Sequence, residues 1–359
     1  MRLNCYGYLY SIRGFAEQSR NFFYSLSKYI DVRMVSLIYN DQEVMPPHIF
    51  ELEKKGSFEI DFNDPALCIA YGNDMQKFCG SHRIGFVVFE NTRLPQDWIW
   101  QLKQLHQVWA PSRWAANVLL ENGIPEAKVR IVPLGVDPHF FNSQGPHYSD
   151  FDNGRFKFLM VGKFEKRKSQ MEVLEAYCTE FRPDDPVQLV LLCHNIKRLS
   201  LNDRATLNKY LEKPHPDIVI MNPFNDHEAV APLYRSSNVL IAPSKAEGWG
   251  LPIIEAMACG VPVITTNYSG QSEYLRHDNP LIIDVNEYED IYDETFYPEK
   301  GKFGVWAKLE VGELRKKMRW SFEHQEELKK IGSEDSLWIQ QNWTWDSAAV
   351  KAVELLKKI

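Results

Sequence analysis

Two acidic residues, Glu247 and Glu255, are separated by seven residues around a turn that contains two glycines. The turn follows an apolar run and precedes a segment that we predict to be a helix opening on Pro252. A helix N-terminus carries unsatisfied N–H groups and a partial positive charge, so it suits a phosphate. A carboxylate on each side can hold hydroxyls of the molecule that carries the phosphate. The pattern therefore predicts a sugar-nucleotide site.

Each acid also has a simpler interpretation. Glu255, if it lies in the first turn of a helix starting near Leu251, interacts favourably with the helix dipole. Glu247 lies in a glycine-rich loop, where a carboxylate either binds a ligand or is simply exposed.

A basic cluster of Lys163, Lys166, Arg167 and Lys168 follows an apolar strand. Cations at the carboxyl end of a strand can neutralise a pyrophosphate leaving group. A solvated basic turn explains this stretch equally well by itself. The site interpretation gains weight because, in one open parallel sheet, this loop and the Glu247 turn lie at the same carboxyl-end edge.

Two segments of the first half add candidates. Glu90 and Asn91 follow an apolar strand, where catalytic side chains often lie, although Asn91 or Thr92 could instead cap the next helix. Gly14 precedes the first helix and could let a phosphate approach, with Arg13 adding positive charge. A loop that needs Gly14 only for its turn is the alternative.

Length and composition favour two domains, because 359 residues exceed one comfortable core. No apolar run has the length of a membrane span, and the first residues lack a secretory signal pattern. The net charge of −7 argues against a nucleic-acid partner. Six scattered cysteines indicate free thiols in a reducing compartment. We expect a cytoplasmic enzyme.

Strand-like and helix-like segments alternate along both halves, which predicts an α/β protein with two doubly wound, Rossmann-like domains facing a cleft. The turn-rich stretch 142–154 is the best linker. We therefore expect an acceptor-side domain at 1–150, a nucleotide-sugar domain at 151–340 and a terminal helix at 341–359. Expected strands are 3–9, 32–38, 66–71, 84–89, 108–110, 129–132, 155–162, 187–193, 218–221, 239–242, 261–265 and 281–283, and expected helices include 15–29, 98–105, 113–121, 171–181, 228–236, 252–259 and 311–331.

The sequence lacks other known nucleotide-binding and metal-binding motifs. The third glycine of a dinucleotide fingerprint is replaced by Ile253, and the lysine of a P-loop by Phe86. The ten histidines show no metal-ligand spacing. We expect no metal and no cofactor.

The stretch from Glu247 to Ile264 resembles the E-x7-E segment of retaining glycosyltransferases of the GT-B fold, specifically glycosyltransferase family 4. The similarity extends to 161–168, 233–244, 108–112 and 132–137, and spans most of 80–275. It implies a nucleotide-sugar donor held mainly by the second domain, an acceptor held mainly by the first, and a terminal helix that crosses back onto the first domain.

Carried over by position, Glu255 would hold the donor ribose and Glu247 the hydroxyls of the transferred sugar. Many members have a histidine after the fourth strand, where this chain has Glu90 and Asn91 instead. The remaining assignments are Gly248, Trp249, Gly250, Leu251 and Gly14 near the diphosphate, Lys163 and Lys168 neutralising it, and Asn222, Pro223 and Phe224 near the nucleobase.

The resemblance implies front-face transfer with retained anomeric configuration and no metal ion. The donor would be a GDP- or UDP-linked hexose, with GDP-mannose favoured, and the acceptor a glycan, a lipid-linked molecule or a small molecule. The first helix could touch a membrane peripherally, although packing in the core is the better interpretation. The alternatives are an inactive nucleotide-sugar-binding module and a phosphorylase-like use of the same fold.

Overall fold

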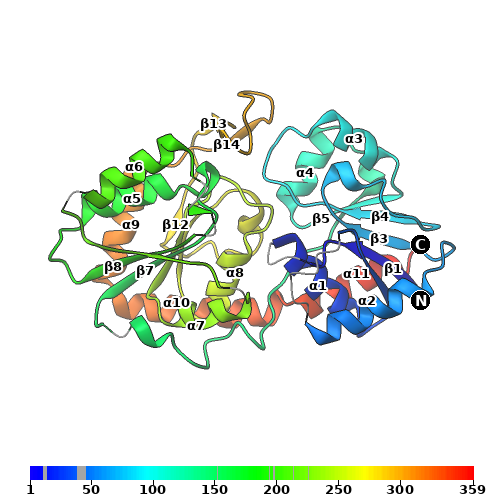
Figure 1. Ribbon diagram of the computed structural model, residues 1–359, viewed down its shortest axis with the longest axis horizontal. Coiled ribbons are helices and arrows are strands. Elements are labelled where there is room, and N and C mark those ends of the chain that lie inside the picture. The colour runs from blue at the N-terminus through cyan, green and yellow to red at the C-terminus, as the bar shows by residue number, and fades with distance from the viewer. Residues whose placement is uncertain are drawn as a thin grey trace. The chain divides into compact units, whose positions relative to one another are not determined.

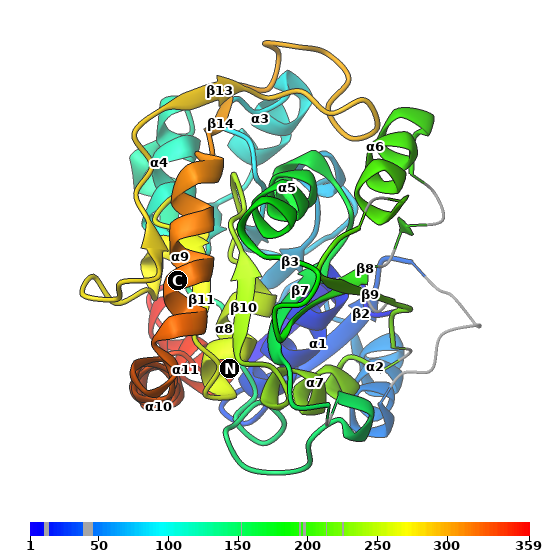
Figure 2. The same ribbon diagram turned by 90° about the vertical axis from the view of Figure 1, so that its left-hand side faces the viewer.

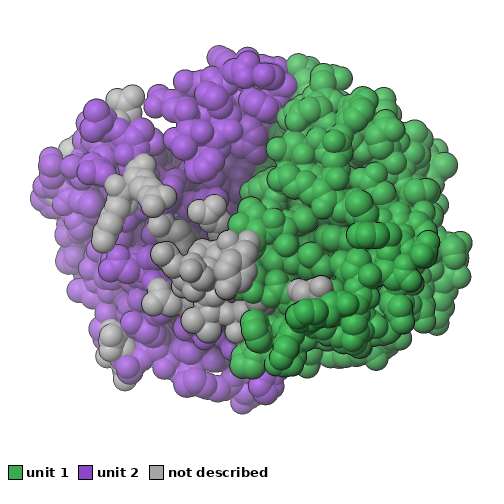
Figure 3. Space-filling model, turned by 45° about the vertical axis from the view of Figure 1, so that its right-hand side comes forward, with its two compact units in different colours: residues 1–137, 342–359 green, residues 138–341 purple. Residues whose placement is uncertain are grey.

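The computed structural model describes residues 1–10, 14–38, 46–151, 153–193, 195–196, 199–212, 214–224 and 226–359. It divides into two compact units (Figure 3). Unit 1 comprises Met1–Asp137 and Asn342–Ile359, and unit 2 comprises Pro138–Gln341. Each unit contains its own parallel six-stranded sheet (Figure 1). The prediction of two Rossmann-like α/β domains is confirmed.

In unit 1 the strands pair in the order β2-β1-β3-β4-β5-β6. Their central residues are almost all apolar and buried, as in a parallel sheet covered on both faces. The elements are β1 (Arg2–Gly7), α1 (Gly14–Ser27), β2 (Asp31–Ser36), α2 (Pro47–Glu59), β3 (Ala66–Ile69), η1 (Gly72–Asp74), β4 (Arg83–Phe86), α3 (Gln96–Lys103), β5 (Gln107–Ala110), α4 (Arg113–Glu121), η2 (Glu126–Lys128) and β6 (Val129–Ile131).

The terminal helix α11 (Trp345–Leu356) belongs to unit 1, where it packs against α1. Thr344 caps it by accepting a hydrogen bond from the amide of Ser347 at 3.1 Å. A Cβ on Gly135 would lie 2.2 Å from the carbonyl carbon of Thr344. Only glycine therefore permits this close approach of the two backbones.

In unit 2 the strand order is β12-β11-β10-β7-β8-β9. Helices α5 and α9 lie side by side over this sheet (Figure 2). The elements are η3 (Ser149–Phe151), β7 (Phe156–Gly162), η4 (Lys166–Lys168), α5 (Gln170–Glu180), β8 (Val187–Cys193), α6 (Leu201–Glu212), β9 (Asp217–Met221), η6 (Glu228–Val230), α7 (Ala231–Arg235), β10 (Val239–Ala242), α8 (Leu251–Ala258), β11 (Val263–Thr266), η7 (Ser269–Glu273), β12 (Ile282–Ile283), α9 (Val311–Glu323) and α10 (Gln325–Asn342).

A short antiparallel hairpin, β13 (Tyr288–Asp290) and β14 (Val305–Ala307), forms a separate two-stranded sheet in unit 2. Lys245 anchors it: its Nζ lies 2.6 Å from Glu289 and 2.7 Å from Glu172 on α5. Buried Trp306 packs with Ala246 and Ile291 beside this pair. The hairpin is therefore built onto the loop that follows β10.

The division between the units falls at Asp137, so the expected boundary at 150 lies inside unit 2. Arg235 explains the difference. Its side chain donates hydrogen bonds to the carbonyls of Pro146 at 2.9 Å and Asn142 at 3.1 Å. The turn-rich stretch thus packs on unit 2 instead of lying between the units.

No helix in the described ranges is both long enough and apolar enough to cross a lipid bilayer.

Candidate functional site

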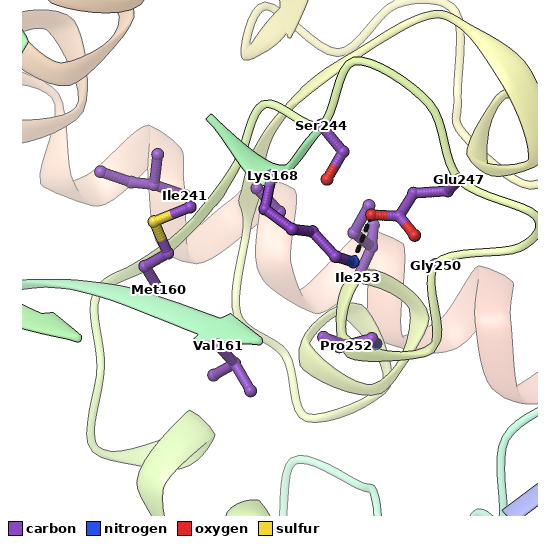
Figure 4. A pocket seen from close by; sticks show the side chains of 10 residues that line it. Met160, Val161, Lys168, Ile241, Ser244, Glu247, Gly250, Pro252 and Ile253 are labelled. Carbon is purple, nitrogen blue, oxygen red and sulfur yellow. Dashed lines mark hydrogen bonds and ion pairs between the residues drawn. The ribbon is translucent and has the colours of Figure 1, made fainter. Parts of the chain in front are cut away.

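A pocket in unit 2 lies at the carboxyl ends of β7 and β10 (Figure 4). The first turn of α8 closes one side of it, and Lys168 and Glu247 point toward one another within it. This is the sheet edge at which parallel α/β proteins place ligands. Its lining residues are Met160, Val161, Lys168, Ile241, Ala242, Ser244, Glu247, Gly250, Pro252 and Ile253.

The backbone around Glu247 is held from both sides. Its amide donates to the hydroxyl of Ser269 at 2.8 Å, and its carbonyl accepts from the amide of Gly270 at 2.9 Å. A Cβ on Gly270 would lie 2.2 Å from the carbonyl oxygen of Gly248, so only glycine fits there. The carboxylate of Glu247 is therefore carried by a fixed loop.

Two cations flank the Glu247 carboxylate, whose residue is only 5% exposed. Lys168 Nζ lies 2.5 Å from Oε1, and Arg167 Nη1 lies 3.0 Å from Oε2. Burial by itself would raise the pKa of Glu247, but the charges of Lys168 and Arg167 and hydrogen bonds with Lys168 and Ser244 outweigh it and hold that pKa at about 2. Glu247 is therefore ionised at neutral pH.

The N-terminus of α8 opens toward the same pocket. Its N-cap, Gly250, has φ 90° and ψ 57°, a left-handed conformation that favours glycine. No side chain caps this end, and Pro252 in the first turn has no N–H to satisfy. The Tyr274 hydroxyl lies 3.0 Å from the carbonyls of both Trp249 and Gly250, which fixes the turn. The arrangement can receive an anion.

Glu255 is buried in the second turn of α8, at 3% exposure. Its Oε1 lies 2.7 Å from His227 Nε2, and its Oε2 accepts the Tyr234 hydroxyl at 3.1 Å. Burial and the neighbouring carboxylate raise the pKa of Tyr234 well above its usual value, so its hydroxyl stays a donor. Because Glu255 lies beyond the first turn, the helix-dipole explanation for it is wrong.

Comparison with known proteins supports a family for this unit. Residues 147–295 match the family model of glycosyl transferases group 1. A curated relative, the D-inositol 3-phosphate glycosyltransferase of Pseudarthrobacter chlorophenolicus, is 27% identical over 195 residues, or 50% of this chain and 46% of the relative. The chain therefore spans about half the length of the curated relatives it matches. These matches support the glycosyl transferases group 1 family.

Solved structures show the fold over the whole chain. Sucrose-phosphate synthase from Thermosynechococcus elongatus has a TM-score of 0.70 at 15% identity, covering 100% of this chain and 98% of that chain. HepE from Anabaena, solved in complex with UDP-glucose, has a TM-score of 0.73 at 11% identity and covers 100% of both chains. The two Rossmann-like domains thus have neighbours of the GT-B type.

Within residues 147–295, which match the family model, the structure separates the two predicted lysines. Lys168 pairs with Glu247, whereas Lys163 Nζ lies over the ring of Phe296, 5.5 Å from its centroid. Arg167, which belonged to the predicted basic cluster but had no individual site role, contacts Glu247 and lies 2.5 Å from Glu165. The planar guanidinium presents a different nitrogen to each carboxylate, Nη1 to Glu247 and Nη2 to Glu165. Its place in the basic cluster was the available signal.

The predicted nucleobase residues follow β9 in the same segment. Asn222 is exposed, and Pro223 and Phe224 are half-buried. Phe224 packs against Tyr148, with the ring centroids 6.0 Å apart. His227 lies on the same loop and reaches Glu255, although its spacing gave no sign of this contact.

The predicted residues of the first half lie in unit 1, outside the matched segment. Gly14 is the first residue of α1, and Arg13 lies outside the described residues. Asn91 is 4% exposed and donates to the carbonyl of Arg93 at 2.6 Å, which shapes its own loop. Glu90 beside it is half-buried.

The capping interpretation of this loop is wrong. Helix α3 has Pro95 at its N-cap and no side-chain cap hydrogen bond, so neither Asn91 nor Thr92 caps it. Instead, the side chain of Asn122 pins the loop, accepting from the amide of Leu94 at 2.9 Å and donating to the carbonyl of Thr92 at 3.0 Å.

Proposed function

We propose that this chain is a retaining glycosyltransferase of family 4 that transfers a hexose from a nucleotide-diphosphate sugar without a metal ion. The observation that carries the proposal is the Glu247 carboxylate, buried and ionised between Lys168 and Arg167 beside the N-terminus of α8. The Glu247 carboxylate, the Lys168 ammonium and the N-terminus of α8 meet in one pocket. Sugar hydroxyls and a diphosphate are complementary to these groups.

In this proposal the diphosphate faces the backbone amides of 248–251, and Lys168 neutralises the charge that develops on it. Lys163, released from Phe296, would add a second cation. Glu247 accepts hydrogen bonds from hydroxyls of the transferred sugar, because an ionised carboxylate is a strong acceptor. Preorganised charges of this kind act in place of a bound cation, so the transfer needs no metal.

The other end of the donor would lie along the loop after β9. Glu255 would hold the ribose, and 222–224 would lie near the nucleobase. Gly14 would let the diphosphate approach in unit 1, and Glu90 and Asn91 would position the reacting sugar there. These assignments follow the family resemblance, and the burial of Glu255 supports the first of them.

The donor and acceptor classes follow the same reasoning. HepE is described with UDP-glucose and a relative is named for D-inositol 3-phosphate, so UDP-hexoses and small hydroxylated acceptors join GDP-mannose, glycans and lipid-linked acceptors in our proposal. A cytoplasmic location fits the six cysteines, all of which are free thiols in the structure.

The test is a panel of UDP- and GDP-linked hexoses with and without candidate acceptors, followed by nucleotide release and by NMR of the product anomer. We expect acceptor-dependent release and a product that keeps the donor's α configuration. Turnover lost in EDTA, or an inverted anomer, would contradict the corresponding part of the proposal. Tight donor binding without turnover would favour the inactive binding module, and release requiring only phosphate would favour a phosphorylase.

A further inference from the structure

We infer that His227 is a specificity-determining residue of the nucleoside subsite, because it fixes Glu255 in the position from which that carboxylate distinguishes a ribose from a deoxyribose. This inference rests on the proposed function, which assigns the ribose to Glu255. It adds a residue that neither the sequence pattern nor the pocket lining singles out.

The acceptor capacity of Glu255 supports the inference. A carboxylate oxygen has two lone-pair directions, so the group can accept about four hydrogen bonds. Within the described chain, His227 takes one direction on Oε1 at 2.7 Å, and Tyr234 takes one on Oε2 at 3.1 Å. One acceptor direction then remains on each oxygen. The 2′- and 3′-hydroxyls of a ribose offer a matching pair of donors.

Access to the carboxylate is controlled by the imidazole. Tyr234 is fully buried, whereas the side chain of His227 is 25% exposed. A ligand that reaches Glu255 from solvent therefore passes His227 and not Tyr234. The backbone supports this placement, because His227 lies on the loop that also carries Asn222 and Phe224, the residues that we expect at the nucleobase.

The imidazole is itself held in place. Phe141, 4% exposed, meets it edge-on with centroids 5.5 Å apart, and packs on the ring of Tyr234 at 6.2 Å. A carboxylate held by two fixed donors loses little freedom when a ligand binds. A site of this kind rejects an analogue without the hydroxyl, because the buried acceptor is then left without a donor. Without His227, Glu255 can turn and water can satisfy Oε1.

The experiment compares the binding of UDP and GDP with that of their 2′,3′-dideoxy forms by calorimetry on the full chain. We expect the wild type to bind the ribonucleotide about 10- to 100-fold more tightly, as one or two lost hydrogen bonds to a charged acceptor imply. His227→Ala should reduce that ratio to about threefold or less. His227→Gln should restore most of it, because its amide can donate at nearly the reach of Nε2.

His277→Ala is the matched control, since His277 is an exposed histidine of the same unit. Equal discrimination in wild type and His227→Ala would overturn the inference while leaving the proposed function intact. No discrimination in the wild type would overturn both the inference and the assignment of the ribose to Glu255, but not the proposed transfer reaction. No binding of any nucleoside diphosphate by the wild type would instead overturn the proposed function. If His227→Ala does not fold, His227→Asn replaces it: the shorter amide should lose the discrimination that Gln keeps.

Discussion

Replacing Lys168 by methionine tests the charge arrangement on which the proposed mechanism depends. Methionine keeps most of the side-chain length but removes the ammonium that contacts Glu247 Oε1. Two consequences follow together. The leaving diphosphate loses a cation, and the Glu247 carboxylate keeps only Arg167 as its positive partner.

The size of the effect can be worked from Glu247. Its pKa falls from 4.5 to about 2 in the folded protein, which corresponds to ~3 kcal/mol in favour of the ionised form. This net shift remains after burial has opposed it, and Lys168 contributes both a charge and a hydrogen bond, so loss of Lys168 should forfeit a large part of the shift. A lost preorganised donor at the transition state lowers kcat by about 10²-fold. We therefore expect kcat to fall by about 100-fold or more in Lys168→Met.

The pH profile separates the two consequences. In Lys168→Met, burial of Glu247 is opposed by one cation fewer, so its pKa rises from about 2. The acid limb of kcat/KM should therefore move to higher pH, and the loss of activity should be larger at pH 5 than at pH 8. Initial rates of nucleotide release over a series of donor concentrations, measured across that pH range, give both kcat and kcat/KM.

Lys166→Met is the matched control. It removes a charge from the same loop, but Lys166 is exposed and its Nζ lies over the ring of Tyr292, 5.3 Å from the centroid. We expect kcat within about threefold of wild type for this variant, as for most surface changes. Equal losses in Lys166→Met and Lys168→Met would mean that only the net charge of the loop matters. An unchanged kcat in Lys168→Met would remove this lysine from the site.

Three further changes test single features of unit 2. Gly250→Ala places a Cβ at a residue with φ 90°, close to the Tyr274 hydroxyl. We therefore expect a loss of about 1–2 kcal/mol in the free energy of unfolding, measured by urea titration, and weaker donor binding, measured by calorimetry. Glu247 has a depressed pKa of about 2, so it stabilises the fold above about pH 4.5 and this stabilisation disappears as pH falls toward 2; Glu247→Gln should flatten that part of the stability curve. Burial raises the pKa of Asp335 to about 7, so the free energy of unfolding should decline as pH rises from about 4 to 7. Asp335→Asn should abolish this decline, as measured by chemical denaturation at pH 5 and 8. A decline that persists in Asp335→Asn would assign it to another group.

The parallel sheets were predictable because their strands are continuous apolar runs between turn residues. Helix α2 was not, because its apolar periodicity misleads: Phe50 and Phe58 are exposed, while Gly56 is buried. A Cβ on Gly56 would lie 1.9 Å from the carbonyl oxygen of Met34, so the backbone of α2 packs directly against the backbone of β2. Such packing leaves no hydrophobic stripe for a sequence pattern to detect.

The hairpin and the last helices show a second limit. A lysine such as Lys245 would be expected at the surface, yet it is 4% exposed and contacts the carboxylates of Glu172 and Glu289, which come from distant segments. No strand was expected where β13 and β14 form, because the sequence there is acidic and aromatic without a continuous apolar run. The expected helix 311–331 is in fact two helices, which break at His324. The hairpin depends on tertiary contacts rather than on local preference.

The candidate site, too, was only partly predictable from the sequence. The pairing of Lys168 with Glu247 followed from the rule that loops after parallel strands share one edge. The short η4 turn then sends successive side chains to different partners: Lys166 to Tyr292, and Arg167 and Lys168 to Glu247. No spacing in the sequence states which of three adjacent cations will face the acid.

The two carboxylates of the E-x7-E segment are thus equal in sequence and unequal in chemistry. Glu247 has cations as partners, so its role depends on charge, and Glu247→Gln should lose function while keeping its shape. Glu255 is oriented by a hydroxyl and an imidazole, so its role depends on the direction of its free lone pairs. An amide in place of Glu255 would turn one acceptor oxygen into a donor that faces either His227 or Tyr234. That substitution should therefore disturb the nucleoside end alone, raising the donor KM more than it lowers kcat.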